Sequence, residues 1–435
     1  MSARRISRAR TRAALGLTLA ALAAGTAAGA GPAAAEPAGQ SEAAPAAPAA
    51  DCSAAFRIEE KLVSGTTWRM CWRPEPREGI VLEDISYQPP GEARPIKVLN
   101  SAKLAQIHVP YDDGHSEFND LTDYFFGKGL LEMSPGECPG GTIKTVKVPG
   151  SAAVKGLCTT TRARGHAYRY QPDTGKSYQK QGRDLLVYSV NEVDWYEYIT
   201  EWRFSDDGTI SMNVGATGSL SPHDYDAGDG RGWPIGKGAE ARATSHSHNV
   251  FWKLDFALDG SSKTKIEQYD STVSPPGQGR PGPSNKTTRT KVAKELAGDI
   301  KNMRWWRVVS TAGKNKDGHP RSYELVPGPT AKYPGRAFTK HDIYFTEYKK
   351  CEQYASDNPH DCGPGGGRSV DKWVNGQTLT RPVVWMNIGF HHIARDEDQQ
   401  PMPVHWQGFS ISPRDVTAMN PLTPKELAGE NGQPD

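Results

Sequence analysis

Short segments in which apolar and polar residues alternate recur along most of the chain. Alternation with a period of two is typical of β-strands that bury one face, and clusters of Gly, Pro, Asn and Asp separate these segments. The clearest examples are WRMCWR, GIVLEDISY, AQIHVPY, DLLVYSV, YEYITEWRF, TISMNV, HNVFWKLDFAL, RWWRVVS, DIYFTEY, PVVWMNIGFHHI and HWQGFSI. Many short strands with turn signals between them predict an all-β fold, a large antiparallel β sandwich.

Helical periodicity is scarce by comparison. The segment KVAKELAGDIKNM (291–303) fits it best and predicts one short helix. The Pro- and Gly-rich stretch 273–284 is predicted to be a surface loop rather than a domain linker, because strand patterns of the same kind continue on both sides of it.

The N-terminal residues follow a different pattern. Five arginines precede an apolar run rich in Ala and Leu and then Ala33, Ala34 and Ala35, which predicts a secretory signal peptide over residues 1–35. Arg4 and Arg5 can also be read as a twin-arginine export signal. Residues 36–50 are rich in Pro and Ala and predict a disordered spacer, which leaves 51–435 as a single domain. We therefore expect a secreted protein that is not held in a membrane.

Removal of the signal peptide changes the charge balance. Without its five arginines, the 52 basic residues of the chain fall to 47, against 50 acidic ones. A net charge of about −3 indicates no electrostatic surface for nucleic acid.

Six cysteines in an exported chain predict disulfides rather than thiolate metal ligands. Six cysteines allow fifteen connectivities, and proximity in the sequence favours one of them. The pairs in that connectivity are Cys52 with Cys71, Cys138 with Cys158, and Cys351 with Cys362. Histidines would then have to supply any soft ligation of a metal.

Two histidines, His246 and His248, lie one residue apart in the strand-like segment SHSHNVFWKLDFALDG. Side chains at positions i and i+2 of a strand point to the same face, so both imidazoles can reach one object. Taken alone, the pattern also fits a polar strand that faces water. The apolar alternation that follows it indicates a buried face, however, and buried imidazoles must be hydrogen-bonded or ligated.

A third ligand is available in VVWMNIGFHHIARDED, where His391 and His392 alternate across a strand and only one can face the pair. Three imidazoles without a thiolate fit copper(II) or zinc, and the spacing does not choose between them. A further segment, VNEVDWYEYITEWRFSDDGTI (190–210), is a dense aromatic strand that ends in an Asp-Gly turn. Aromatic core packing also accounts for this segment.

Taken in order, several segments resemble the catalytic domain of the copper-containing amine oxidases, whose topaquinone cofactor is made from one of their own tyrosines. The match covers roughly residues 66–421. AQIHVPYDDG contains the family's Val-Pro-Tyr, and FNDLTDYFFGKG resembles its Phe-Asp-x-Gly-Glu-Tyr-x-x-Gly segment. SHSHNVFWKLDFALDG resembles its His-x-His copper strand, and IGFHHIARDEDQQPMPVHWQGF resembles the segment of its third histidine.

The resemblance implies a role for each matching position. His246, His248 and His392 would bind copper, and His392 is preferred to its neighbour because it precedes an Ile-x-Arg-x-Glu-Asp run. Tyr196, counted back from the Asp-Gly turn, would become topaquinone. Asp120 would be the catalytic base, whose pKa burial would have to raise, and Tyr111 would hydrogen-bond the quinone oxygen.

The function that the resemblance implies is the oxidation of primary amines by dioxygen, which yields aldehyde, ammonia and hydrogen peroxide. It also implies a homodimer and matches Cys138 and Cys158 to a structural disulfide. An alternative is a copper-binding protein on the same scaffold that lacks the quinone. A zinc hydrolase with Asp120 as its base is a third reading, but it leaves the tyrosine-bearing segment without a role.

Three parts of the chain depart from the family pattern. The signature Thr-x-x-Asn-Tyr-Asp/Glu reads Glu-Val-Asp-Trp-Tyr-Glu at 192–197, so the indole of Trp195 replaces a small amide and is expected to crowd Tyr196. Thr122 and Asp123 replace the Gly and Glu that follow the base, and Arg381 replaces an aspartate of the family's calcium site. We therefore expect no calcium beside Asp255, because a guanidinium repels a cation.

Overall fold

A computed structural model describes residues 52–427, except 115, 173–174, 223–229, 240, 278–281, 302 and 363–366. The described residues belong to one compact unit, residues 46–435. The predicted signal peptide (1–35) and almost all of the predicted spacer (36–50) precede this unit, and both lie outside the described residues.

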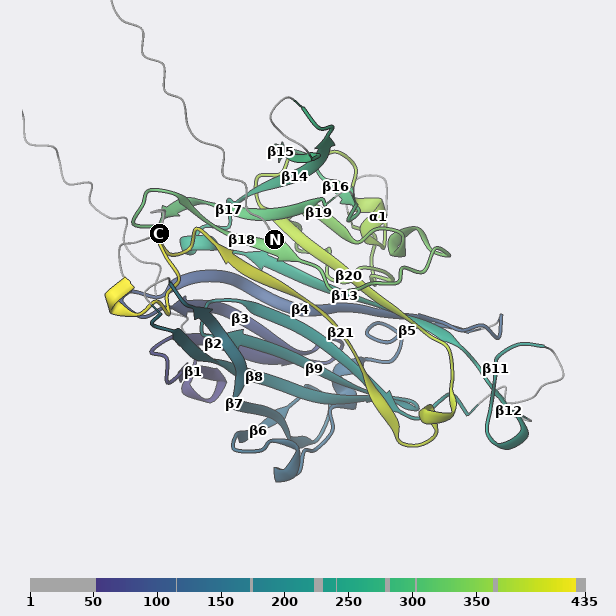
Figure 1. Ribbon diagram of the computed structural model, residues 1–435. Helices are drawn as coiled ribbons and strands as arrows, with labels where there is room; N and C mark the ends of the chain where they lie inside the picture. The colour runs from purple at the N-terminus through teal and green to yellow at the C-terminus, as the bar shows by residue number, and fades with distance from the viewer. Residues whose placement is uncertain are drawn as a thin grey trace, which may run out of the picture. The chain divides into compact units, whose positions relative to one another are not determined.

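Two large antiparallel sheets make up most of this unit (Figure 1). Within the described ranges, the first sheet has nine strands in the order β1-β2-β3-β4-β13-β20-β19-β16, and β5 pairs with β4. Their bounds are β1 (Arg57–Lys61), β2 (Thr67–Glu75), β3 (Gly79–Gln88), β4 (Ile96–Pro110), β5 (Glu117–Asn119), β13 (His246–Phe256), β16 (Leu296–Gly298), β19 (Ile343–Glu347) and β20 (Pro382–His392).

The second sheet has ten strands in the order β15-β14-β17-β18-β21-β10-β9-β8-β7-β6. Their bounds are β6 (Thr142–Lys147), β7 (Ala153–Tyr170), β8 (Tyr178–Val193), β9 (Tyr196–Ser205), β10 (Ile210–Gly218), β14 (Lys265–Ser274), β15 (Ser284–Val292), β17 (Trp305–Lys314), β18 (Pro320–Val326) and β21 (Met402–Arg414). Two short strands, β11 (Trp233–Ile235) and β12 (Ala241–Ala243), pair separately, and α1 (Val370–Trp373) is a single helical turn.

The inner faces of the two large sheets pack against each other. The rings of Trp202 on β9 and Trp252 on β13 meet edge to face with centroids 5.4 Å apart. The indole N–H of Trp68 on β2 donates to the carbonyl of Ser205 on β9 (3.0 Å). One cluster of buried apolar side chains spans both sheets, so the predicted all-β antiparallel sandwich is confirmed.

The outer face of the nine-stranded sheet is covered at its centre. Every residue of β13 is buried, because Phe251 packs there in a second apolar cluster with Trp373 and Trp385. The alternation in HNVFWKLDFAL predicted one buried face, whereas both faces of this strand are buried, as in strands covered on both sides of a sheet.

The predicted helix over 291–303 is wrong. This region contains the end of β15 and then β16, which pairs with β19. The reason is tertiary: the buried carboxylate of Glu295 accepts hydrogen bonds from the backbone N–H groups of Glu347, Asn375 and Gln377 (3.0–3.2 Å). These bonds hold the segment extended against its short helical pattern.

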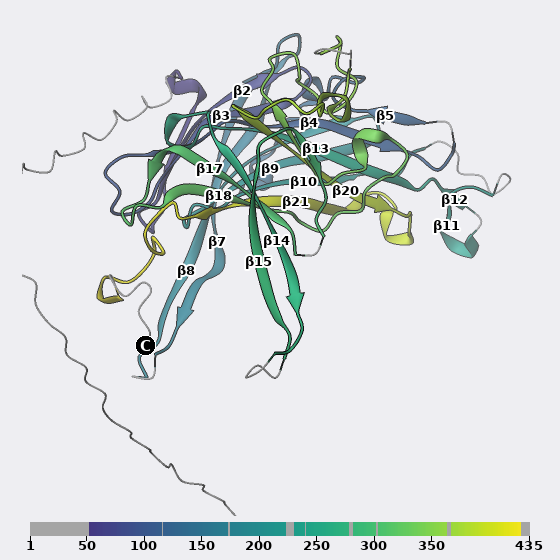
Figure 2. The ribbon, with the colours of Figure 1, turned by 90° about the horizontal axis from the view of Figure 1, so that it is seen from above.

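Two hairpins, β7–β8 and β14–β15, project from the ten-stranded sheet (Figure 2). The Pro- and Gly-rich stretch joins β14 to β15, so it is a hairpin connection, as the loop prediction required. The three predicted disulfides are confirmed, and they are Cys52–Cys71, Cys138–Cys158 and Cys351–Cys362.

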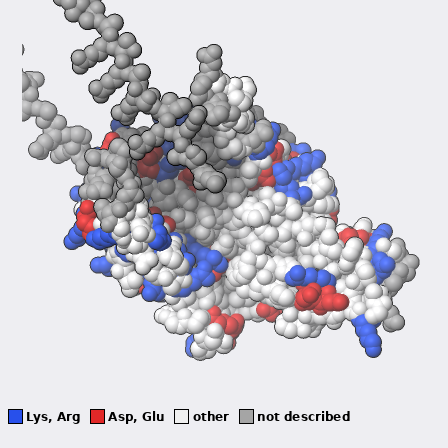
Figure 3. All heavy atoms as spheres, viewed as in Figure 1, with Lys and Arg blue, Asp and Glu red and all other residues white. Residues whose placement is uncertain are grey.

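Charged side chains of both signs are interspersed on the face seen in Figure 3, around a broad area with few charges. A surface of this kind produces no large single-sign field. No helix in the described part of the chain has the length and apolarity that a membrane crossing requires.

Candidate metal centre

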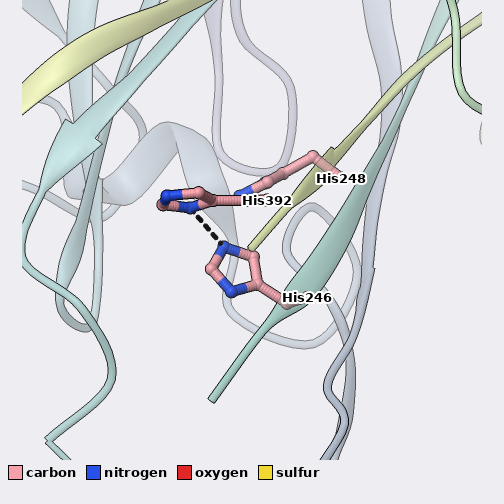
Figure 4. A group of neighbouring side chains, drawn as sticks. All are labelled: His246, His248 and His392. Atoms are coloured by element: carbon pink, nitrogen blue, oxygen red, sulfur yellow. Dashed lines mark hydrogen bonds between the residues drawn. The ribbon is translucent and has the colours of Figure 1, made fainter. Parts of the chain in front are cut away.

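Three histidines converge between the two sheets (Figure 4). β13 and β20 are antiparallel neighbours, and their register places His246 directly opposite His392. His248 lies two residues further along β13 and therefore points to the same inner face. One ring nitrogen of each histidine lies within 4.8 Å of the other two, and all three side chains are buried. His391, the other candidate, is exposed.

In His392 and His248, the hydrogen bond made by one ring nitrogen leaves a lone pair on the other ring nitrogen. Nε2 of His392 donates to the carboxylate of Asp398 (2.8 Å), which leaves Nδ1 free to act as a ligand. Nδ1 of His248 lies 3.2 Å from the hydroxyl of Tyr198, while its Nε2 is buried without a protein partner. A buried nitrogen without a partner is costly unless it is ligated, so the donor set fits a metal ion.

Burial also keeps the imidazoles neutral. Desolvation holds the pKa of His246 and of His248 well below the ordinary value, and neighbouring histidines lower both further. Burial lowers the pKa of His392 as well, although the hydrogen bond with Asp398 opposes this shift. Neutral imidazoles are the form that binds a metal, and three of them suit copper(II) or zinc.

The phenol of Tyr196 faces these histidines from the opposite sheet. Tyr196 is the first residue of β9, and its hydroxyl oxygen lies 2.7 Å from Nε2 of His246 and 3.0 Å from Nδ1 of His392. Nδ1 of His392 and Nε2 of His246 are 3.2 Å apart. A metal bound by these nitrogens would therefore have a phenol oxygen next to it.

Asp120 lies directly after β5. Its carboxylate is buried, and burial raises its pKa to about 7, although a hydrogen bond from Tyr198 opposes the shift. Asp120 and Tyr196 line one narrow pocket, which has a volume of about 20 Å³. A buried carboxylate with a pKa near neutrality is suited to proton abstraction.

Tyr111 and Trp195 line the same pocket. Trp195 lies in the two-residue connection between β8 and β9, and its indole N–H donates to the hydroxyl of Tyr111 (3.0 Å). The ring of Tyr111 also stacks on that of His246, with centroids 4.8 Å apart. The structure thus brings Asp120, Tyr111 and Tyr196 to one pocket beside the three histidines.

Sequence reasoning did not assign a role to three residues that touch this site. Asp398 orients His392, Tyr198 lies between His248 and Asp120, and the sulfur of Met402 is 4.0 Å from the Tyr196 hydroxyl. Tyr198 follows Tyr196 at the spacing that places two strand residues on one face, so its position was predictable. Asp398 ends the acidic run after His392, but its contact depends on the turn that follows β20.

Arg381 lies next to Asp255, at the position where the family pattern has an aspartate of its calcium site. Its guanidinium lies 2.6 Å from the carboxylate of Asp255 and 3.6 Å above the ring of Tyr348. A fixed positive charge is therefore already present beside this carboxylate.

Comparisons with known proteins agree with this geometry. The family model described as copper amine oxidase, enzyme domain, matches residues 57–426. The chain is 27% identical to histamine oxidase of Arthrobacter globiformis over 87% of this chain and 59% of that protein. It is 24% identical to primary amine oxidase of Klebsiella aerogenes over 82% of this chain and 52% of that protein. The chain therefore spans only about half to three fifths of the length of these relatives.

Solved structures share the fold. The copper-containing benzylamine oxidase of Hansenula polymorpha superposes with a TM-score of 0.70 at 22% identity, over 84% of this chain and 62% of that one. The amine oxidase of Aspergillus nidulans gives 0.69 at 18% identity, over 82% and 52%. The family match includes the strands that carry the three histidines and Tyr196, and it extends over most of the sequence. The chain therefore belongs to the copper amine oxidase family.

Proposed function

We propose that this protein is a secreted amine oxidase that uses copper and a topaquinone formed from Tyr196 to oxidise primary amines. The products would be an aldehyde, ammonia and hydrogen peroxide. The observation that carries the proposal is the position of the Tyr196 hydroxyl, 2.7 Å and 3.0 Å from two of the three converging imidazoles. Family membership supports the same cofactor pair.

Each residue of the site has a task in this reaction. His246, His248 and His392 would hold the copper, which supplies the redox chemistry that converts Tyr196 and returns electrons to dioxygen. Asp120 would take a proton from the carbon next to the amine nitrogen, and the raised pKa lets it hold that proton near neutral pH. Tyr111 would position the ring of Tyr196 through the hydroxyl that now accepts from Trp195.

Tyr198 connects the base to the metal side of the site. Its hydroxyl donates to Asp120, so the other contact of this oxygen is accepted from the Nδ1–H of His248. This arrangement places the ligating lone pair of His248 on Nε2, toward the other two histidines. The same hydroxyl thereby orients both the carboxylate and one metal ligand.

The test is to incubate the purified metal-free protein with copper(II) and air and then to measure its intact mass. Formation of topaquinone should add two oxygen atoms and remove two hydrogen atoms at Tyr196, and the product should stain in a quinone redox-cycling assay. A Tyr196→Phe variant should bind copper through the same three histidines but show neither change. An unchanged mass in the copper-loaded wild type would contradict the proposal.

The second candidate is a copper-binding protein without the quinone. The observation that favours it is Trp195, which donates a hydrogen bond to the hydroxyl of Tyr111 and lines the same pocket as Tyr196. In that case copper should bind with the mass of the polypeptide unchanged, and no hydrogen peroxide should form from any amine.

Secretion and dimerisation are also part of the proposal. The N-terminal pattern supports export with cleavage after Ala35, and three disulfides fit an oxidising compartment. N-terminal sequencing of protein recovered from culture medium should begin at or near Glu36. Recovery of the uncleaved chain from the cytoplasm alone would refute export.

A further inference from the structure

The pocket that contains Asp120 is lined mainly by aromatic residues. Phe118 meets Tyr111 edge to face with centroids 5.6 Å apart, and it meets Tyr124 at 5.7 Å. Trp195 closes the set, since its ring lies 6.1 Å from both Tyr111 and Phe118 at angles near 80°. Aromatic faces of this kind attract cations, because the face of the ring carries the negative end of its quadrupole.

Two carboxylates contribute to the same pocket. Asp120 is buried at its inner end, and Asp194, which precedes Trp195 in the connection from β8 to β9, lies at its exposed edge. No lysine or arginine is among the described residues that line it. Aromatic walls with carboxylates and no fixed cation form a site for an ammonium ion, as in other cages that bind alkylammonium groups.

The size of the pocket limits what such an ammonium ion can carry. A volume of about 20 Å³ exceeds the roughly 10–15 Å³ that one water needs and leaves room only for a very small group, whereas a cavity that accepts a benzene ring measures roughly 150 Å³. Trp195 is one of the residues that line this pocket, and it stands where the family pattern has a small amide. The hydrogen bond from its N–H to Tyr111 holds the ring in that place.

We propose that Trp195 is a specificity-determining residue that restricts this pocket to short aliphatic ammonium ions, such as methylammonium, and excludes amines that carry an aromatic ring next to the reacting carbon. This inference rests on the proposed amine substrate. It goes beyond that proposal because it names the chemical class and the residue that selects it. Trp195 need not touch the reacting atoms to act in this way, since it removes the space that a larger substituent requires.

The experiment compares methylamine with benzylamine on the copper-loaded protein, by hydrogen peroxide release in air and by calorimetric binding without oxygen. The wild type should prefer methylamine at least tenfold, both in binding and in kcat/KM. Trp195→Asn should reduce this preference at least tenfold, mainly through a lower KM for benzylamine. Trp195→Phe keeps a ring but loses the N–H donor, and it should retain most of the preference.

The two readouts separate failure of this inference from failure of the proposed function. If neither amine is oxidised but methylamine still binds selectively and Trp195→Asn removes that selectivity, the inference stands and the oxidase proposal fails. Equal acceptance of both amines by the wild type would overturn the inference. So would an unchanged preference in Trp195→Asn, a loss of preference in Trp195→Phe as large as that in Trp195→Asn, or the absence of binding by either amine.

Discussion

At the scale of one residue, burial of Asp120 raises the pKa of its carboxyl group and lowers the stability of the fold when that group is charged. Its pKa is about 7 in the folded protein, because burial disfavours the charged form, and about 3.9 in an unfolded chain. Between these values the folded state binds more protons than the unfolded state. The stabilisation from this proton is therefore complete below about pH 4 and is lost as the pH rises through 7.

An Asp120→Asn variant, which has no charge to bury, should be more stable than the wild type at pH 8, and the difference should shrink toward pH 4. The maximum difference is about 4 kcal/mol from the two pKa values. The midpoint of thermal unfolding of the metal-free proteins at pH 4.5, 6 and 8 measures it. Asp317→Asn, which changes the same charge at an exposed turn, is the control. Equal pH dependence in both variants would show that burial of Asp120 is not responsible.

At the scale of elements, the pairing of β13 with β20 builds the metal centre and also joins Asp255 to Arg381. The ion pair lies at the far end of β13 from the histidines, and the guanidinium stands where the family pattern has a calcium-binding aspartate. The guanidinium of Arg381 already provides a positive charge beside Asp255. The unfolding temperature of the wild type should therefore be the same with calcium and with chelator.

Arg381→Asp should lose about 1–3 kcal/mol of stability in chelator, since Asp255 loses its partner and gains a like charge. Calcium should restore part of this loss, up to about 2.7 kcal/mol at a hundredfold excess over the dissociation constant. Arg381→Met is the matched control, which should be destabilised without any response to calcium. Thermal unfolding of the three proteins with and without calcium measures both effects. A wild type stabilised by calcium would contradict this account.

The sequence predicted those features of the elements that depend on local pattern. The alternation of residues predicted the strands and the sandwich, and the spacing of His246 and His248 predicted a shared face. The helix prediction over 291–303 failed because hydrogen bonds to the buried Glu295 come from residues more than 50 positions away. The contact of Tyr198 with Asp120 and the hydrogen bond of Trp195 to Tyr111 depend on packing between strands distant in sequence. Local periodicity carries no information about such contacts.

At the scale of the whole molecule, the stability of the two projecting hairpins is difficult to account for in a single copy of the chain. Seven consecutive residues of β15 are exposed, and beyond Tyr269 the strand β14 pairs only with β15 among the described residues. A two-stranded hairpin is marginally stable in water unless something covers it. A second copy of the chain would provide such cover, and this is the reason that the proposed function includes a homodimer.

Shortening this hairpin should therefore convert the dimer to a monomer without unfolding the sandwich. Asp270 pairs with Thr288, so replacing residues 271–287 by Asn-Gly keeps the register of the remaining strands. Light scattering should give twice the chain mass for the wild type and a single chain mass for the shortened protein. Val273→Asp, on the hairpin and 70% exposed, should weaken the dimer at least tenfold, whereas Val63→Asp, at a site 87% exposed, should leave it unchanged. Copper binding should persist in all of these variants, because the three histidines lie on β13 and β20. A shortened chain that still dimerises would show that the hairpin is not the interface.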